Sequence, residues 1–272
     1  MKKINRRSFP AAALALTACG GSASSTASST ASSAASSEAA STSAAAELTT
    51  VEAGKLTMAT NAAFPPYEMT TDAGEFEGID IDTAKAIAEK LGLELQIDDM
   101  DFDAALLSVQ QGKADIVMAG VTVTDERKAV MDFSDSYATG IQSIIVPEGS
   151  DITSPDDLAG KKIGTQRGTT GYIYCSDDFG DDAVVAYDDG LTAVQALNNG
   201  QVDAVVIDNA PAKEFVAANP GLVILDTSYA EEDYAIGLAK GSALEDAVNA
   251  ALEELKADGT LQSIVDKYIS AE

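Results

Sequence analysis

The 272-residue chain carries 44 Asp and Glu against 17 Lys and Arg, a net charge of −27, and it has no histidine. Its 46% hydrophobic and 22% charged residues are ordinary for a globular protein with a substantial core. A surface this negative repels phosphate backbones and anionic headgroups. Nucleic acid is therefore not an expected partner. Solubility outside the cell explains this acidity, and adaptation to high salt is the alternative.

The first 18 residues have the pattern of an export signal peptide. Residues 1–7 are basic, residues 11–16 are apolar, and Cys19 follows small residues. The stretch 16–19 (LTAC) resembles the lipobox of bacterial lipoproteins, in which the cysteine is acylated and becomes the new N-terminus. We therefore expect a lipid anchor on Cys19 at the outer face of the cell membrane. The alternative is an ordinary cleaved signal with an incidental cysteine.

Residues 19–50 are expected to form a disordered tether behind the anchor. From 20 to 46 the sequence contains only Ser, Ala, Thr and Gly apart from Glu38, so it cannot bury enough apolar surface to offset its ordering entropy. As a random coil it would span about 30 Å. No apolar run in the chain reaches the 18 residues that a spanning helix needs, so the sequence predicts an anchored protein.

From residue 51 onward, predicted strands and helices alternate. The helix over 79–91 is the clearest, because Ala84, Ile87, Ala88 and Leu91 recur at helical spacing. Further helices are predicted over 104–111, 191–197, 211–218, 243–257 and 261–269. Strands are predicted over 55–59, 93–97, 115–119, 143–146, 162–165, 203–207 and 234–239. This alternation favours open, mostly parallel α/β sheets with helices on both faces.

Two segments separated by 88 residues resemble one another. Residues 108–120 and 196–208 both read as a helix end, a glycine, an aspartate, an apolar strand and a loop. Chance similarity between two common units is one explanation. The other is two lobes of one architecture, each presenting a loop at the sheet edge where open α/β sheets bind ligands.

The sequence lacks most of the motifs that mark catalytic and metal sites. Without histidine there is no imidazole base, no Ser-His-Asp triad and no histidine metal site, and no glycine-rich phosphate-binding motif is present. Cys175 is the only cysteine besides Cys19. We expect it to be a buried, inert thiol and not a nucleophile. We therefore expect a binding protein without metal or cofactor, and not an enzyme.

Three loops suit a zwitterionic ligand, which needs donors for its carboxylate and an anion for its ammonium. After the strand over 115–119, Thr124 can cap a short helix whose N–H groups and Arg127 guanidinium point to one place. Residues 168–171 offer N–H and hydroxyl donors, and Asp208 is a natural ammonium partner. The alternatives are a surface ion pair for Arg127 and a helix N-cap for Asp208.

The order of these loops and of other short motifs resembles bacterial extracellular solute-binding proteins of family 3, which bind polar amino acids for ABC importers. The resemblance covers residues 52–269. The motifs are 61–67 (NAAFPPY), 78–82 (GIDID), 102–103 (FD), 122–128 (TVTDERK), 131–134 (MDFS), 158–170 (LAGKKIGTQRGTT), 200–203 (GQVD) and 255–260 (LKADGT).

The resemblance implies roles for individual residues. Phe64 and Phe102 would be aromatic walls around the ligand, and Arg127 would clamp its carboxylate. Gly120 and Thr122 would contact its ammonium and carboxylate. From the second lobe, Thr169 and Thr170 would bind the carboxylate and Asp208 the ammonium.

Two further positions, Asn61 and Gln166, would face the ligand side chain. Relatives that bind cationic amino acids usually carry an acid where this chain has Asn61. Since both side chains are neutral, we expect a neutral polar ligand such as glutamine or cystine.

The resemblance also implies a type II periplasmic-binding-protein fold, with two α/β lobes joined by crossing hinge strands. We expect lobe 1 to comprise 51–142 plus 233–272, and lobe 2 to comprise 143–232. The protein would be a monomer that closes on an amino acid and delivers it to an ABC permease with its ATPase. A surface adhesin or sensor lipoprotein on the same fold and a periplasmic dehydratase-like enzyme are the alternatives.

Overall fold

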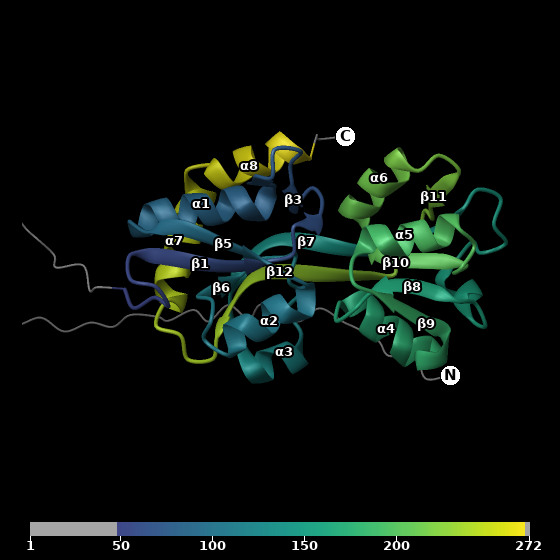
Figure 1. Cartoon of the computed structure of the whole chain (residues 1–272), viewed down its shortest axis with the longest axis horizontal. Coiled ribbons are helices and arrows are strands. Elements are labelled where there is room, and N and C mark those ends of the chain that lie inside the picture. The colour runs from purple at the N-terminus through teal and green to yellow at the C-terminus, as the bar shows by residue number, and fades with distance from the viewer. Residues whose placement is uncertain (1–47, 270–272) are drawn as a thin grey trace, which may run out of the picture. The chain divides into compact units, whose positions relative to one another are not determined.

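The computed structural model describes residues 48–269 (Figure 1). The predicted signal peptide over 1–18, the predicted lipid anchor on Cys19 and most of the predicted tether lie outside the described residues. Between residues 48 and 269, no helix is both long and apolar enough to cross a bilayer.

Two antiparallel strands run through the middle of the sheet, β7 (Met131–Pro147) and β12 (Ala230–Ala239) (Figure 1). They belong to a nine-stranded sheet with the order β5-β1-β6-β12-β7-β10-β8-β9, and β11 pairs with β7. β12 pairs with β7 from Met131 to Gln142, whereas β10 and β11 pair with the last part of β7. Each of the two strands therefore passes from one lobe into the other.

The first lobe surrounds parallel strands at one end of the sheet. β1 pairs with β5 and β6 in parallel, and β6 then pairs with β12. Helices cover both faces, with α1 and α7 on one side and α2 on the other (Figure 1). The bounds are β1 Lys55–Thr60, α1 Ile79–Leu91, β5 Glu94–Asp99, α2 Phe102–Gln110, β6 Ile116–Val117, α3 Asp125–Val130, α7 Glu245–Ala257 and α8 Thr260–Tyr268. A small antiparallel sheet adds β2 Ala63–Phe64, β3 Glu68–Thr70 and β4 Phe76–Glu77.

The second lobe repeats this plan at the other end of the sheet. β8 pairs in parallel with β9 and β10. Helix α4 lies against one face of these strands, and α5 and α6 lie on the other side (Figure 1). The bounds are η1 Pro155–Leu158, β8 Ile163–Gln166, α4 Thr170–Phe179, η2 Asp181–Ala183, β9 Val184–Tyr187, α5 Gly190–Asn198, β10 Ala204–Asp208, α6 Asn209–Ala218 and β11 Leu222–Ile224.

The strand predicted over 143–146 is only the end of the much longer β7. Residues 131–142 alternate irregularly between buried and exposed, and their pairing with β12 is interrupted by register shifts near Tyr234 and Gly237. A pattern without clean alternation gives no strand signal in the sequence. The strands β2, β3, β4, β9 and β11 are two to four residues long and were not predicted either.

The two similar segments occupy matching places in the two lobes. Gly112 and Gly200 follow a helix in the left-handed conformation, with φ of 66° and 67°. The aspartate three residues later accepts a backbone N–H in or next to a neighbouring strand in both lobes. Asp115 accepts the Thr57 N–H at 2.8 Å, and Asp203 accepts the Lys162 N–H at 2.7 Å. This shared geometry favours two lobes of one architecture over chance similarity.

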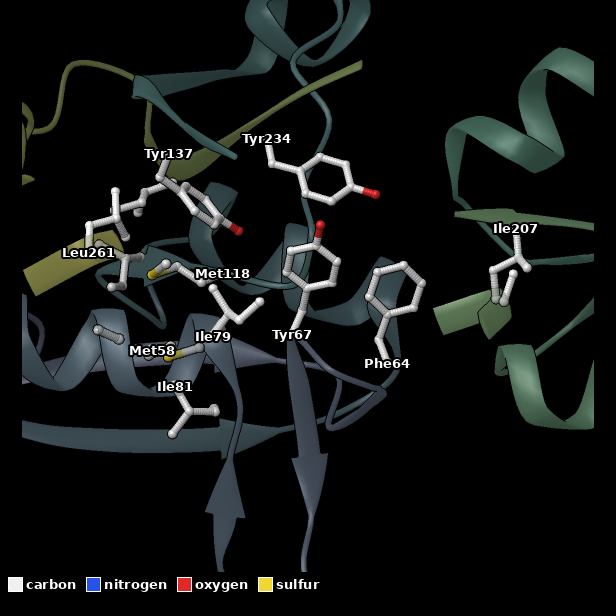
Figure 2. Close-up of a cluster of buried hydrophobic side chains, with 14 of the residues drawn as sticks. Met58, Phe64, Tyr67, Ile79, Ile81, Met118, Tyr137, Ile207, Tyr234 and Leu261 are labelled. Carbon is white, nitrogen blue, oxygen red and sulfur yellow. The ribbon is translucent and has the colours of Figure 1, made fainter. Parts of the chain in front are cut away.

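The apolar core has separate clusters in the two lobes and a large one that includes residues from both. Figure 2 shows part of the large cluster, where the rings of Phe64, Tyr67 and Tyr234 lie beside one another. Cys175 is fully buried in the second lobe, and burial raises the pKa of its thiol to about 12. The thiol is therefore protonated at neutral pH, as expected for an inert core cysteine.

Candidate functional site

One pocket lies where the two lobes meet, and all ten residues predicted to bind the ligand line it. They lie at the ends of strands or in the segments that follow them, in both lobes, which is where α/β sheets place ligand contacts. The pocket is lined by Asn61, Phe64, Glu68, Phe102, Ala119, Gly120, Thr122, Arg127, Gln142, Gln166, Thr169, Thr170, Val206, Ile207, Asp208 and Tyr234.

Arg127 reaches from the first lobe toward the second. Thr124 caps α3 by accepting the Arg127 N–H, and the guanidinium donates to the carbonyl oxygens of Thr122 at 2.7 Å and Gly168 at 3.1 Å. It also lies over the Phe102 ring, 5.4 Å from the centroid. Arg127 is 8% exposed, and no carboxylate of the described residues pairs with it directly. Burial lowers the pKa of the guanidinium, while the negative charge of Glu232 acts in the opposite direction.

The Glu232 carboxylate joins the two lobes at the same place. Its Oε2 accepts hydrogen bonds of 3.0 Å each from the hydroxyls of Thr122 and Thr170 and from the side-chain amide of Gln142. Thr122 belongs to the first lobe and Thr170 begins α4 of the second. The two hydroxyls predicted to bind a ligand carboxylate thus donate to a carboxylate of the protein itself.

Asp208 ends β10 and caps α6 by accepting the Ala210 N–H at 3.1 Å. Its Oδ2 accepts the Ile141 N–H at 2.7 Å and the Tyr234 hydroxyl at 2.8 Å. The alternative of a helix N-cap is therefore realised, and the carboxylate also faces the pocket. Burial raises its pKa to about 6, although the three donors act in the opposite direction.

Asn61 and Gln166 meet across the lobes. The Gln166 amide donates to the Asn61 Oδ1 at 2.8 Å, and the Asn61 amide donates to the Met100 carbonyl at 3.0 Å. Thr169 is occupied within its own lobe, since its hydroxyl donates to the Gln166 carbonyl at 2.8 Å and caps α4. These contacts place a pair of neutral amides at one end of the pocket.

Gly120 lets aromatic rings approach the pocket closely. A Cβ at this position would lie 2.9 Å from the Phe64 ring and 3.2 Å from the Tyr234 ring, and the backbone has a φ of 55°. Its N–H donates to Asp80 at 3.0 Å, so this donor is already satisfied within the protein. Gly120 therefore shapes the pocket as well as lining it.

Sequence reasoning missed four polar residues of this region: Glu68, Gln142, Glu232 and Tyr234. The last three lie on the long crossing strands, whose position between the lobes is not visible in a hydrophobic pattern. Glu232 stands within an acidic run in an acid-rich chain, so composition gives it no distinction.

In this arrangement the lobes are closed on one another. The pocket itself is narrow, with a cavity volume of about 30 Å³. The described residues also contain no group of three or more Cys, Asp or Glu side chains placed to hold a metal ion.

Comparisons with known proteins agree with this architecture. The model of the bacterial extracellular solute-binding proteins, family 3, matches residues 56–271. A probable histidine-binding protein of Neisseria gonorrhoeae is 32% identical over 100% of this chain and 97% of that protein. The L-cystine-binding protein TcyJ of Escherichia coli K12 is 33% identical over 81% of this chain and 85% of its own length. An ancestral arginine-binding protein bound to glutamine superposes with a TM-score of 0.77 at 42% identity, covering 81% of this chain and 100% of that one.

These comparisons confirm the type II periplasmic-binding-protein fold, with two α/β lobes joined by crossing strands. They also decide between the predicted classes of protein. The family and the matched neighbours are solute-binding proteins and not enzymes, which removes the dehydratase-like alternative.

Proposed function

Since the chain belongs to the bacterial extracellular solute-binding proteins of family 3, we propose that it is the substrate-binding component of an amino-acid ABC importer. It captures a free amino acid between its two lobes. The observation that supports this most directly is that Arg127 and Asp208 bring opposite charges to one pocket from different lobes. A zwitterion is the small molecule that matches such a pair, with its carboxylate toward the guanidinium and its ammonium toward the carboxylate.

The ligand side chain in this proposal is neutral and polar, as in glutamine or cystine. The pair formed by Asn61 and Gln166 offers amide donors and acceptors without charge. The matched proteins are named for histidine, cystine and arginine, and the ancestral arginine-binding protein is bound to glutamine. The side-chain preference therefore depends on residues of this chain and not on the family.

Binding requires the lobes to separate and close again. In the closed arrangement, polar groups of the two lobes form hydrogen bonds with one another. Gln166 bonds to Asn61, and Glu232 accepts hydrogen bonds from Thr122 and Thr170. A ligand replaces part of these contacts, and hinge motion in β7 and β12 signals its presence to the permease. The moving parts are lobe 1 over 51–142 plus 233–272 and lobe 2 over 143–232.

The protein acts outside the cytoplasm, in keeping with its extracellular family. In our proposal a lipid on Cys19 holds it at the outer face of the membrane, and residues 19–50 form the tether. It works there as a monomer beside a permease with its ATPase. A tether lets the binding lobes sample the space above the permease without leaving the membrane.

Calorimetry of the purified protein with the twenty common amino acids and cystine tests the function. We expect a neutral polar amino acid to bind most tightly and Arg127→Ala to abolish or strongly weaken that heat signal. A tightest ligand of lysine or arginine would refute the neutral preference alone. If no amino acid binds the wild-type protein, the proposed function is wrong.

A further inference from the structure

Glu68 is a pocket residue whose carboxyl group receives no hydrogen bond from the part of the chain that the structure describes. It begins β3, its side chain is completely buried, and it lines the pocket together with Asn61 and Gln166. Among the described residues, neither carboxyl oxygen of Glu68 accepts a hydrogen bond from an N–H or O–H group of the protein. A buried charge without partners is very costly, so this carboxyl group needs an explanation.

Its close neighbour is the carboxyl group of Asp80, in the first turn of α1. Asp80 Oδ2 accepts the Gly120 N–H at 3.0 Å and the Tyr137 hydroxyl at 2.8 Å, whereas Oδ1 has no donor from the described residues. Two carboxyl groups form a hydrogen bond with one another only when one of them carries a proton.

The other groups that face Glu68 do not supply a positive charge. They are Asp99 at the end of β5, Tyr67 next to Glu68 in the chain, and Tyr137 on β7. All of them are neutral or negative, so the surroundings disfavour a second negative charge at this place.

We infer that Glu68 and Asp80 share one proton, and that this proton makes the pocket choose ligands by the charge of their side chain. The inference rests on the proposed amino-acid function and adds a specificity-determining residue to it. Burial raises the pKa of Glu68 well above its ordinary value and that of Asp80 to about 6. The donors from Gly120 and Tyr137 favour the charged form of Asp80, which leaves the proton on Glu68.

The shared proton has different consequences for neutral and cationic ligands. A neutral side chain hydrogen bonds to the protonated Glu68 and changes no charge. A cationic side chain pairs with Glu68 only after the Glu68 O–H bond breaks and the proton passes to solvent, which leaves two carboxylates facing the cation. Affinity for a cationic ligand must then rise with pH, by up to about tenfold per pH unit for one released proton.

Arginine and citrulline form a matched ligand pair, because they share the backbone groups and chain length and differ in a guanidinium against a urea group. The test is to measure their Kd values by calorimetry from pH 5.5 to 8.5, in two buffers of different ionisation enthalpy. The ratio of the two Kd values cancels the contributions of Arg127 and Asp208, which contact the shared backbone groups. We expect the ratio to shift toward arginine as pH rises, with more protons released on binding arginine than citrulline.

The variant Glu68→Gln keeps a donor toward Asp80 but cannot lose a proton. We expect citrulline to bind it within about threefold of wild type, and arginine to bind at least about tenfold more weakly at pH 8.5, with a pH-independent ratio. Glu75→Gln makes the same substitution at an exposed position between β3 and β4 and should behave like wild type.

A pH-independent ratio in the wild-type protein, or equal effects of Glu68→Gln on both ligands, would overturn the inference. If Glu68→Gln does not fold, the proton release of the wild-type protein decides alone. Failure of both arginine and citrulline to bind also overturns it, while binding of another amino acid in the survey would leave the proposed function standing.

Discussion

At the scale of single residues, the pocket holds charged side chains that are already hydrogen bonded within the protein. The Arg127 guanidinium donates to two carbonyl oxygens and lies over Phe102, which fixes its orientation before any ligand enters. Such preorganisation limits the entropy lost on binding. It also means that Arg127 contributes to the folded structure and not only to the ligand site.

We expect Arg127→Ala to weaken amino-acid binding by at least about tenfold, because a charge-assisted hydrogen bond contributes about 1.5–3 kcal/mol. Arg127→Lys should restore only part of the affinity, since an ammonium cannot form the paired hydrogen bonds of a guanidinium. Arg127→Ala should also lower the free energy of unfolding by about 1–3 kcal/mol, through the lost contacts to Thr122 and Gly168.

Calorimetry and urea unfolding measure the two effects separately. Arg167→Ala is the matched control, because that arginine is exposed and pairs with the exposed Asp188, so its loss should change neither quantity. Wild-type affinity of Arg127→Ala would show that Arg127 is purely structural.

The second residue-scale prediction concerns the pH dependence of binding through Asp208. Burial raises its pKa to about 6, so the carboxyl group is negative at pH 7.5 and becomes neutral as the pH falls below 6. The ammonium of an amino acid keeps its charge over this range. Affinity should therefore be constant above pH 7 and decrease as the pH falls through 6.

Asp208→Asn should bind more weakly than wild type at pH 7.5 and show little further loss at pH 5. The measurement is a calorimetric titration series with a neutral amino acid, so that the ligand side chain does not titrate. An unchanged affinity of the wild-type protein at pH 5 would argue that Asp208 does not contact the ammonium.

At the scale of secondary-structure elements, the crossing strands do more than connect the lobes. β12 brings Glu232 to the point where the loop after β6 meets the start of α4, and β7 brings Gln142 to the same point. On the same strands Tyr234 packs into the space above Gly140, where a Cβ would lie 2.5 Å from its ring. Side chains on the hinge are thus in contact with both lobes.

Glu232→Ala should favour the open arrangement of the ligand-free protein, since it removes the carboxylate that accepts hydrogen bonds from both Thr122 and Thr170. Small-angle scattering should give a larger radius of gyration than that of wild type. Loss of hydrogen bonds to a charged group should also lower the free energy of unfolding by about 2 kcal/mol. Glu231→Ala is the control, because the neighbouring side chain is exposed on the same strand. Identical scattering of Glu232→Ala and wild type would contradict this role.

At the scale of the whole molecule, the question is how an acidic binding protein stays near the membrane. A net charge of −27 repels anionic lipid headgroups, so electrostatic adsorption cannot hold the chain there. The helices among residues 48–269 do not cross a bilayer. The anchor we propose is an acyl chain on Cys19.

Cys19→Ala should release the protein from cells into the medium, because acylation supplies the apolar contact with the bilayer. Immunoblots of the membrane and medium fractions after a high-salt wash measure the effect. Cys175→Ala is the matched control, since its thiol is buried in the second lobe and should not affect anchoring. Retention of Cys19→Ala on washed membranes would place the anchor elsewhere.

The sequence by itself determined the elements whose pattern is local. Helix α1 has the predicted bounds, because its apolar spacing and the glycine after it are both written in consecutive residues. The two similar segments that lie 88 residues apart likewise indicated two similar lobes. Their glycines suit a left-handed helix end, and their aspartates accept backbone N–H groups in or next to a neighbouring strand. The resemblance to family 3, carried by short motifs of consecutive residues, named ten residues that line the pocket.

Only the tertiary structure decided which of the remaining groups share that pocket. The irregular strand β7, the position of the Glu232 carboxylate and the burial of Glu68 near Asp80 depend on contacts between residues far apart in the chain. One-dimensional patterns report burial and period but not the partners of a polar group. The ionisation of a carboxyl group is set by those partners and by its loss of water, so the charge of the pocket could be read only from the folded chain.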